Sequence, residues 1–178
     1  MQQEDRGYSL YMHGLSQSGQ LGIGFTNERV IDLPQKVDIR VHFVQITCGA
    51  GHSVALSDKG KVYSWGLNLL GQLGQGGIHP LWSPTLIQSL KDVNIVKVAS
   101  GAGHSLAIDQ SNTTYSWGAS ADFQTGIYVK PSGFSGMDTK QIITLPQRVE
   151  GLNCRKVQIV SISCGLKHTA VITFCPKT

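Results

Sequence analysis

The stretch ITCGAGHSVAL at residues 46–56 returns as VASGAGHSLAI at 98–108 and as ISCGLKHTAVI at 162–172. Each copy keeps a glycine three positions before a histidine and continues into an apolar segment. Self-similarity at a spacing of about 50 residues is typical of proteins built from repeated structural units. We therefore interpret each copy as one unit of a repeating architecture.

Two further motifs advance along the chain together with the first. The glycines of the second motif, Gly14, Gly66 and Gly118, are 52 residues apart both times. It reads YMHGLSQSGQLG at 11–22, YSWGLNLLGQLG at 63–74 and YSWGASADFQTG at 115–126. A proline-led segment then follows as LPQKV at 33–37, SPTLI at 83–87 and LPQRV at 145–149. Because the three marks keep their order, the repeat is genuine.

Short strands, and no helices, are expected within each repeat. No stretch of 10–12 residues carries a helical stripe of apolar side chains. The turn at 57–60 ends in a glycine that Asn112 replaces in the next copy, and asparagine tolerates the left-handed backbone of a hairpin turn. The 21 glycines among 178 residues fit many tight turns. The segments predicted as strands include 61–65, 85–90 after Pro84, 96–100 and 104–108.

Four short strands in about 50 residues describe one blade of a β-propeller. The motifs resemble those of the RCC1 (regulator of chromosome condensation) repeat family, whose repeat carries CGxxHSxxL and then WGxNxxGQLG. The resemblance covers residues 8–174 and is carried by Cys48, Gly49, His52, Ser53, Trp65, Gly66, Asn68 and Gly71-Gln72-Leu73-Gly74. It implies an all-β fold of about three propeller blades. RCC1-like propellers are expected to have seven such blades, so these three would form part of a larger propeller.

We predict a single RCC1-repeat region over 1–178. It would divide into a half blade at 8–45, a blade at 46–97, a blade at 98–156 with an insertion at 127–141, and a half blade at 157–174. Propellers close with about four to eight blades. Further blades are therefore expected from a longer chain, which we favour, or from self-association.

The repeated histidines, tryptophans and glycines are interpreted as structural. Equivalent positions of successive repeats lie around a ring, so the histidines are not expected to converge on a metal ion. Each histidine is expected to hydrogen-bond the backbone of the glycine turn before it, and each tryptophan to pack between neighbouring blades. The structural set is Gly49, His52, Trp65, Gly66, Gly101, His104, Trp117, Gly118, Gly165 and His168.

The sequence shows no pattern of catalytic, metal-binding or cofactor-binding residues. It lacks CxxC, HExxH and GxSxG, and no Lys-Ser/Thr pair follows the GQLG runs as a phosphate loop requires. The N-terminal MQQEDRGYSL has no apolar region of a signal peptide, and no apolar run reaches a membrane-spanning length of about 18 residues. We expect a non-enzymatic intracellular protein, cytoplasmic or nuclear, with no cofactor, no metal and no membrane contact.

The insertion at 127–141 is the main departure from the repeat and is rich in glycine, serine and proline. Loops on a rigid scaffold often carry function, and aromatic and methionine side chains suit partner binding. We therefore name four candidate partner-binding residues: Lys130, Phe134, Met137 and Lys140. The alternative is a tolerated insertion without a role.

These observations favour a non-catalytic scaffold that binds another protein. The resemblance implies one alternative, guanine nucleotide exchange on a Ran-like small GTPase, which needs no catalytic triad. A second alternative is contact with chromatin or DNA through residues 148–178, which hold five basic residues and one acid. The formal net charge of +4 is small, so nucleic acid is not a favoured partner.

Overall fold

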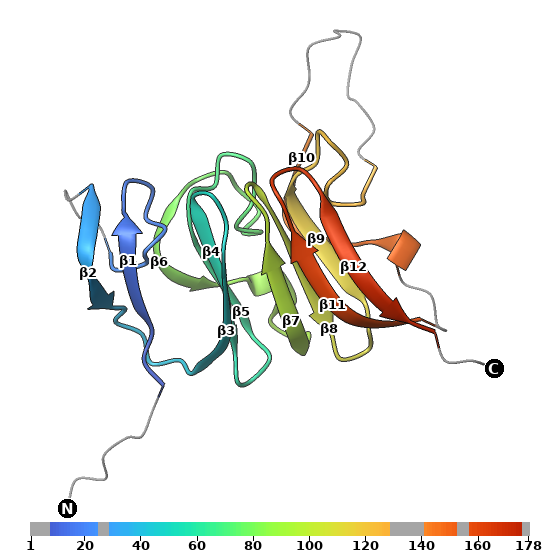
Figure 1. Cartoon of the computed structure of the whole chain (residues 1–178), viewed down its shortest axis with the longest axis horizontal. Coiled ribbons are helices and arrows are strands. Elements are labelled where there is room, and N and C mark those ends of the chain that lie inside the picture. Colours follow the sequence, from blue (N-terminus) through green and yellow to red (C-terminus); the bar gives the residue numbers. More distant parts are fainter. Residues whose placement is uncertain (1–7, 25–28, 129–140, 153–156, 176–178) are drawn as a thin grey trace, which may run out of the picture.

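The computed structural model describes residues 8–24, 29–128, 141–152 and 157–175. This part of the chain is all-β, as expected, with two short 3-10 turns and no α-helix (Figure 1). Within it, no helix is long and apolar enough to cross a membrane. The strands are β1 Tyr11–Leu15, β2 Val30–Lys36, β3 Phe43–Cys48, β4 His52–Ser57, β5 Val62–Gly66, β6 Leu81–Leu86, β7 Ile95–Ser100, β8 His104–Asp109, β9 Thr114–Ala119, β10 Ile142–Arg148, β11 Gln158–Cys164 and β12 Thr169–Phe174.

The strands form four antiparallel sheets that follow one another in chain order across Figure 1. The first sheet pairs β1 with β2, and the fourth pairs β11 with β12. The second and third are four-stranded meanders, ordered β3-β4-β5-β6 and β7-β8-β9-β10. Consecutive strands pair because short turns join them, which is the simplest way to build an antiparallel sheet.

The two four-stranded sheets repeat the same register. His52 lies opposite Gly66 across β4 and β5, and His104 lies opposite Gly118 across β8 and β9. The hairpin turns also match, since Gly60 has a φ of 69° and Asn112 a φ of 66°. The prediction that asparagine replaces glycine in a left-handed turn is confirmed.

The prolines do not begin the outer strands as expected. The fourth strand of the second sheet is Leu81–Leu86 rather than 85–90, with Pro84 inside it, and Gln88–Leu90 forms a 3-10 turn. Pro34 and Pro146 likewise lie within β2 and β10. All three strands are at sheet edges, where a residue without an N–H group leaves no ladder bond unmade.

The hydrophobic core lies between the second and third sheets. β4 and β8 are buried along their whole length, whereas β12 has only half-buried and exposed residues. The terminal sheets are therefore much less covered than the middle ones. The core cluster is Val54, Leu56, Val62, Ile87, Leu90, Ile95, Val98, Ala107, Tyr115, Trp117 and Ile143.

Candidate interaction surface

The repeated histidines join neighbouring sheets. The Nε2 atom of His52 lies 2.9 Å from the Ser105 hydroxyl of the third sheet, and that of His104 lies 3.0 Å from the Thr169 hydroxyl of the fourth. For the rings of His52 and His104, the expected hydrogen bond to the preceding glycine turn is therefore wrong, since their Nδ1 atoms have no partner. The glycine serves a steric purpose instead, because a Cβ on Gly49 would lie 2.2 Å from Cε1 of the His52 ring.

The hydrogen-bond network determines the protonation of these histidines. The Ser105 hydroxyl donates its one proton to the Gln72 carbonyl at 2.9 Å, so Nε2 of His52 must donate to Ser105. Burial, together with a smaller effect of charge on the next histidine along, lowers the pKa of His52 and of His104 to about 4. Both rings are neutral at pH 7 and act as buried donors that connect sheets.

Two of the three tryptophans, Trp65 and Trp117, pack against the turn of the preceding sheet. Trp65 Nε1 donates to the Gln20 carbonyl at 3.0 Å, and Trp117 Nε1 donates to the Gln72 carbonyl at 2.9 Å. Both rings are completely buried. A Cβ on Gly74 would lie 2.9 Å from Nε1 of Trp117, so the GQLG turn is glycine-rich where the next indole lies against it.

Gly66 and Gly118 complete this structural set. Their φ values are 104° and 99°, a region that side chains rarely adopt. A Cβ on Gly66 would lie 2.5 Å from the Gly51 carbonyl oxygen, so the neighbouring strand could not approach. Gly101 repeats the steric role of Gly49 beside His104, and Gly165 repeats it beside the exposed His168.

The described residues contain no group of three or more histidine, cysteine, aspartate or glutamate side chains that could hold a metal ion. Burial raises the pKa of the Cys164 thiol to about 11, an effect that a hydrogen bond with Thr169 partly opposes. The thiol therefore stays protonated at neutral pH and is a poor nucleophile. The buried titratable groups serve the packing of the sheets.

A groove crosses the loops that join the strands at one end of the four sheets. We call it the loop groove, and its volume is about 480 Å³. Leu15, Leu67 and Ala119 occupy the position after the repeated glycine of the second motif, so the repeat itself places apolar side chains in a row. Leu70 and Leu166 extend this apolar lining, and Leu166 is 70% exposed.

An exposed aromatic pair stands beside the loop groove, with one ring just before the insertion and the other at its start. The rings of Phe123 and Tyr128 stack with centroids 6.4 Å apart, and they are 58% and 72% exposed. Phe123 has a φ of 58°, where the first two repeats have Gly19 and Gly71. A bulky residue in the left-handed region carries strain, and such strain clusters at functional sites.

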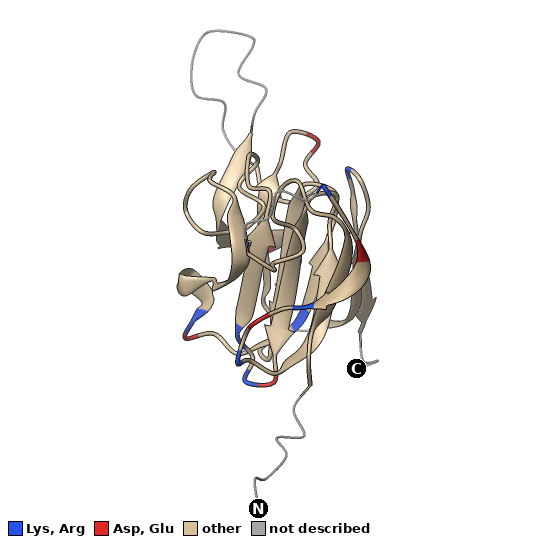
Figure 2. Ribbon diagram, turned by 90° about the vertical axis from the view of Figure 1, so that its left-hand side faces the viewer, with Lys and Arg blue, Asp and Glu red and all other residues tan. Residues whose placement is uncertain are grey.

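The four predicted partner-binding residues, Lys130, Phe134, Met137 and Lys140, lie outside the described residues. The described stem of their loop starts next to the loop groove, because Asp122 lines the groove and forms an ion pair with Lys167 at 3.3 Å. Charged residues elsewhere are scattered and of both signs in Figure 2. Of the five basic residues at 148–178, only Arg148 and Lys167 are described.

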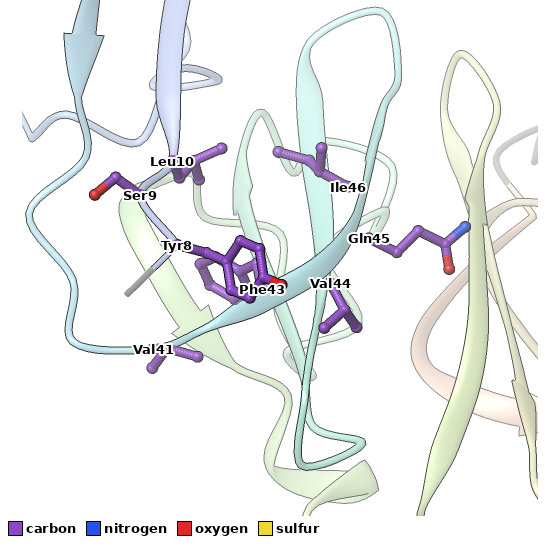
Figure 3. A pocket seen from close by; sticks show the side chains of 8 residues that line it. All are labelled: Tyr8, Ser9, Leu10, Val41, Phe43, Val44, Gln45 and Ile46. Carbon is purple, nitrogen blue, oxygen red and sulfur yellow. The ribbon is translucent and has the colours of Figure 1, made fainter. Parts of the chain in front are cut away.

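A smaller pocket lies where the first sheet meets β3 (Figure 3). Its volume is about 160 Å³, and Tyr8, Leu10, Phe43 and Ile46 are among its lining residues. Pockets for drug-sized ligands measure about 300–1,000 Å³, so this one is too small for such a molecule. Gln45 extends toward β7, where its side-chain amide pairs with the backbone of Val98.

The sequence did not indicate the loop groove or the aromatic pair as a site. A signal for the pair was present, because Phe123 replaces a glycine at a repeat position. The groove depends on the packing of neighbouring sheets, which the periodic pattern of a single repeat does not describe.

Family models match most of the chain. The model described as "Regulator of chromosome condensation (RCC1) repeat" matches residues 9–56, 59–108 and 111–172. A second model with the same description matches residues 43–72 and 95–124.

Curated relatives share this region. The chain is similar to the probable E3 ubiquitin-protein ligase HERC6 of Homo sapiens, with 35% identity over 171 residues, 92% of this chain and 15% of HERC6. It is also similar to the ultraviolet-B receptor UVR8 of Arabidopsis thaliana, with 32% identity over 161 residues, 90% of this chain and 34% of UVR8. The chain thus spans about a third or less of either relative.

Solved structures show the same fold. Prp20p of Saccharomyces cerevisiae superposes with a TM-score of 0.79 and 22% identity, covering 95% of this chain and 40% of Prp20p. Human WBSCR16 superposes with a TM-score of 0.68 and 25% identity, covering 95% of this chain and 55% of WBSCR16.

Proposed function

Because the chain belongs to the RCC1 (regulator of chromosome condensation) repeat family, we propose that it is a non-catalytic scaffold that binds another protein. Recognition takes place at the loop groove and at the stem of the insertion. The buried histidines and tryptophans hold neighbouring sheets in fixed positions, so the loops between the strands form a rigid surface. Rigid scaffolds that present loops are a common basis for binding.

The observation that carries the proposal is the exposed aromatic pair beside the loop groove. Phe123 and Tyr128 are largely exposed, and Phe123 occupies a backbone conformation that suits glycine. A residue that costs stability and exposes apolar surface is easiest to explain by a partner that covers it. Aromatic side chains are also enriched at the centres of protein interfaces.

The groove favours an extended partner segment with apolar side chains. Its lining is mostly Leu, Ala and Gly, repeated from one sheet to the next, and a polar pair, Asp122 and Lys167, closes the end near the insertion. We propose that Lys130, Phe134, Met137 and Lys140 of the insertion add contacts to the same partner.

The test is quantitative co-purification with matched variants. Leu166→Asp places a charge at the groove, and Leu33→Asp is its control, because Leu166 and Leu33 are 70% and 67% exposed and Leu33 lies on β2. We expect Leu166→Asp to lower recovery of the partners at least about tenfold, since the added carboxylate loses water at the interface. Replacement of 129–140 by a glycine-serine linker should also lower it. Equal recovery with both Asp variants would contradict the proposal.

The second candidate is guanine nucleotide exchange on a small GTPase. Family membership supports it, and Prp20p, whose fold is similar, binds Gsp1p and histones. Release of a fluorescent GDP analogue from Ran at micromolar chain distinguishes the two candidates. Acceleration would favour exchange, and an unchanged rate would favour the scaffold. Steeply salt-dependent binding to DNA would instead favour the chromatin alternative.

We also propose that the four sheets are propeller blades and half blades, divided as the sequence predicts, in a cytoplasmic or nuclear protein. The solved propellers that the chain matches are longer than it is. Further blades would then come from a longer polypeptide or from other copies of the chain.

A further inference from the structure

Strand β1 of the first sheet resembles β5 and β9, each of which pairs with a strand on both sides. β1 corresponds in the repeat to β5 and β9, and it pairs with β2 as β5 pairs with β6. In the complete sheets, β4 and β8 cover the other edge of these strands. Among the described residues, nothing pairs with that edge of β1.

Gly14 is the clearest sign of an absent neighbour. Its φ of 107° matches the 104° of Gly66 and the 99° of Gly118. A Cβ on Gly66 or Gly118 would collide with the adjacent strand, yet a Cβ on Gly14 would meet nothing within 4 Å. β1 therefore has the glycine backbone that allows a neighbouring strand to approach closely, but no described strand lies there.

The fourth sheet offers the complementary edge. β11 and β12 correspond to β3 and β4, but no described strand covers the second edge of β12. Beside it lies a pocket of about 580 Å³, lined in part by Gln124, Gly126, Val149 and Thr169. Corresponding groups on the preceding sheet, Gln72 and Gly74, contact the buried Trp117. The pocket thus corresponds to the site that Trp117 fills on the preceding sheet, but no described tryptophan occupies it. We call it the open seat.

We propose that β1 of a second copy of this chain adds to β12 and places His13 in the open seat. The pairing of β4 with β5 sets the register: His168 opposite Gly14 of the second copy, and Ala170 opposite Met12. The bond from the Leu67 amide to the Gly51 carbonyl, 2.7 Å long, predicts one from Leu15 of the second copy to Lys167. The imidazole of His13 takes the place of the indole.

The result is a four-stranded sheet shared by two copies. Such a head-to-tail junction leaves the same two edges at the ends of the pair, so it can repeat or close. Two copies in a closed ring would hold four complete sheets and two shared ones. Six sheets lie within the range of about four to eight for propellers in general, and are one fewer than the seven expected of RCC1-like propellers.

The first test is a gain-of-function substitution, measured by sedimentation of the whole chain from about 0.1 to 50 µM. His13→Trp supplies the indole that fills the same seat twice within the chain, and His13→Ala is its control. We expect His13→Trp to tighten association at least about tenfold, toward species of twice the 19.2 kDa chain mass or more. His13→Ala should weaken association. An unchanged, monomeric His13→Trp chain would overturn the proposal.

The second test checks the register by a disulfide between two chains whose four native cysteines are replaced by serine. Met12→Cys in one chain and Ala170→Cys in the other should cross-link, because closely opposed side chains on antiparallel strands suit a disulfide. Ile172→Cys lies on the same face, two residues out of register, and should react far more slowly. Equal rates for both pairs would refute the register. Asp122, Gln124 and Lys167 line both the open seat and the loop groove. Apart from the native cysteines, the two tests change only residues of β1 and β12 that lie outside the loop groove, so failure here would leave the proposed function untouched.

Discussion

Acidification from pH 7 to pH 5 should destabilise the chain through two buried histidines. In the folded state the pKa of His52 and of His104 is about 4, whereas an unfolded histidine has a pKa of 6.5. Between these values the unfolded chain binds protons that the folded chain excludes, so stability falls as the pH falls. The contribution is complete above about pH 6.5 and is lost as the pH approaches 4.

The size of the effect follows from the two pKa values. At pH 5 an unfolded histidine is almost fully protonated, while a folded one with a pKa of about 4 is mostly neutral. Linkage then gives a loss of about 2 kcal/mol for each histidine between pH 7 and pH 5, or about 4 kcal/mol for the pair. This is a large share of the roughly 5–15 kcal/mol that stabilises a domain.

Urea unfolding followed by tryptophan fluorescence measures this loss. With a slope of about 2 kcal/mol per molar urea, the midpoint should fall by about 2 M. His52→Gln and His104→Gln serve as controls, because glutamine keeps a donor for the hydroxyl of the next sheet and does not titrate. Each should remove about half of the pH dependence, and the double variant nearly all of it. If the double variant lost as much stability as the unaltered chain, the buried neutral histidines would not be the cause.

Three further substitutions test the packing, each by urea unfolding at pH 7.5. Trp117→Phe should cost about 1–2 kcal/mol, because it removes the hydrogen bond from the indole to the Gln72 carbonyl. The carbonyl still accepts a hydrogen bond from Ser105, so it is not left unpaired. A loss below about 0.5 kcal/mol would contradict this role of Trp117. Gly22→Ala should cost about 1–3 kcal/mol more than Gly24→Ala. Both glycines have positive φ, but only at Gly22 would an added Cβ lie within 3 Å of the Trp65 ring. Equal costs would contradict close packing of Trp65 against Gly22. Phe123→Gly should stabilise the chain by about 1 kcal/mol by relieving a left-handed backbone, and it should weaken partner binding; a less stable chain would show that Phe123 is not strained.

The strands and the repeat were predictable from sequence because they depend on local residue patterns. Alternating apolar residues identify strands such as β8, and Asn112 in place of Gly60 identifies a turn. The contacts between sheets were not predictable in the same way. The partner of His52 is Ser105, 53 residues further along, and the pattern of one repeat does not show which hydroxyl of the next sheet faces the ring.

The glycines show the same limit in physical terms. Gly49 lies in the turn between β3 and β4, but its second role, leaving room for the His52 ring, depends on contacts that the sequence does not show. The sequence predicts a strand that begins just after Pro84, but Pro84 lies inside an edge strand, where its missing N–H costs nothing. Position in a sheet and proximity in space decide these roles, and both arise only when the sheets assemble.

Hydrogen exchange of the chain with its purified partner bound is the most direct measurement of where recognition takes place. Backbone amides at 49–51, 67–72, 119–124 and 166–167, which lie in or beside the loop groove, should exchange more slowly in the complex. Amides of β2 and β6, at the sheet edges, should be unaffected. Protection confined to those edge strands, with no change at the groove, would contradict the proposal that the repeated loops form the binding surface.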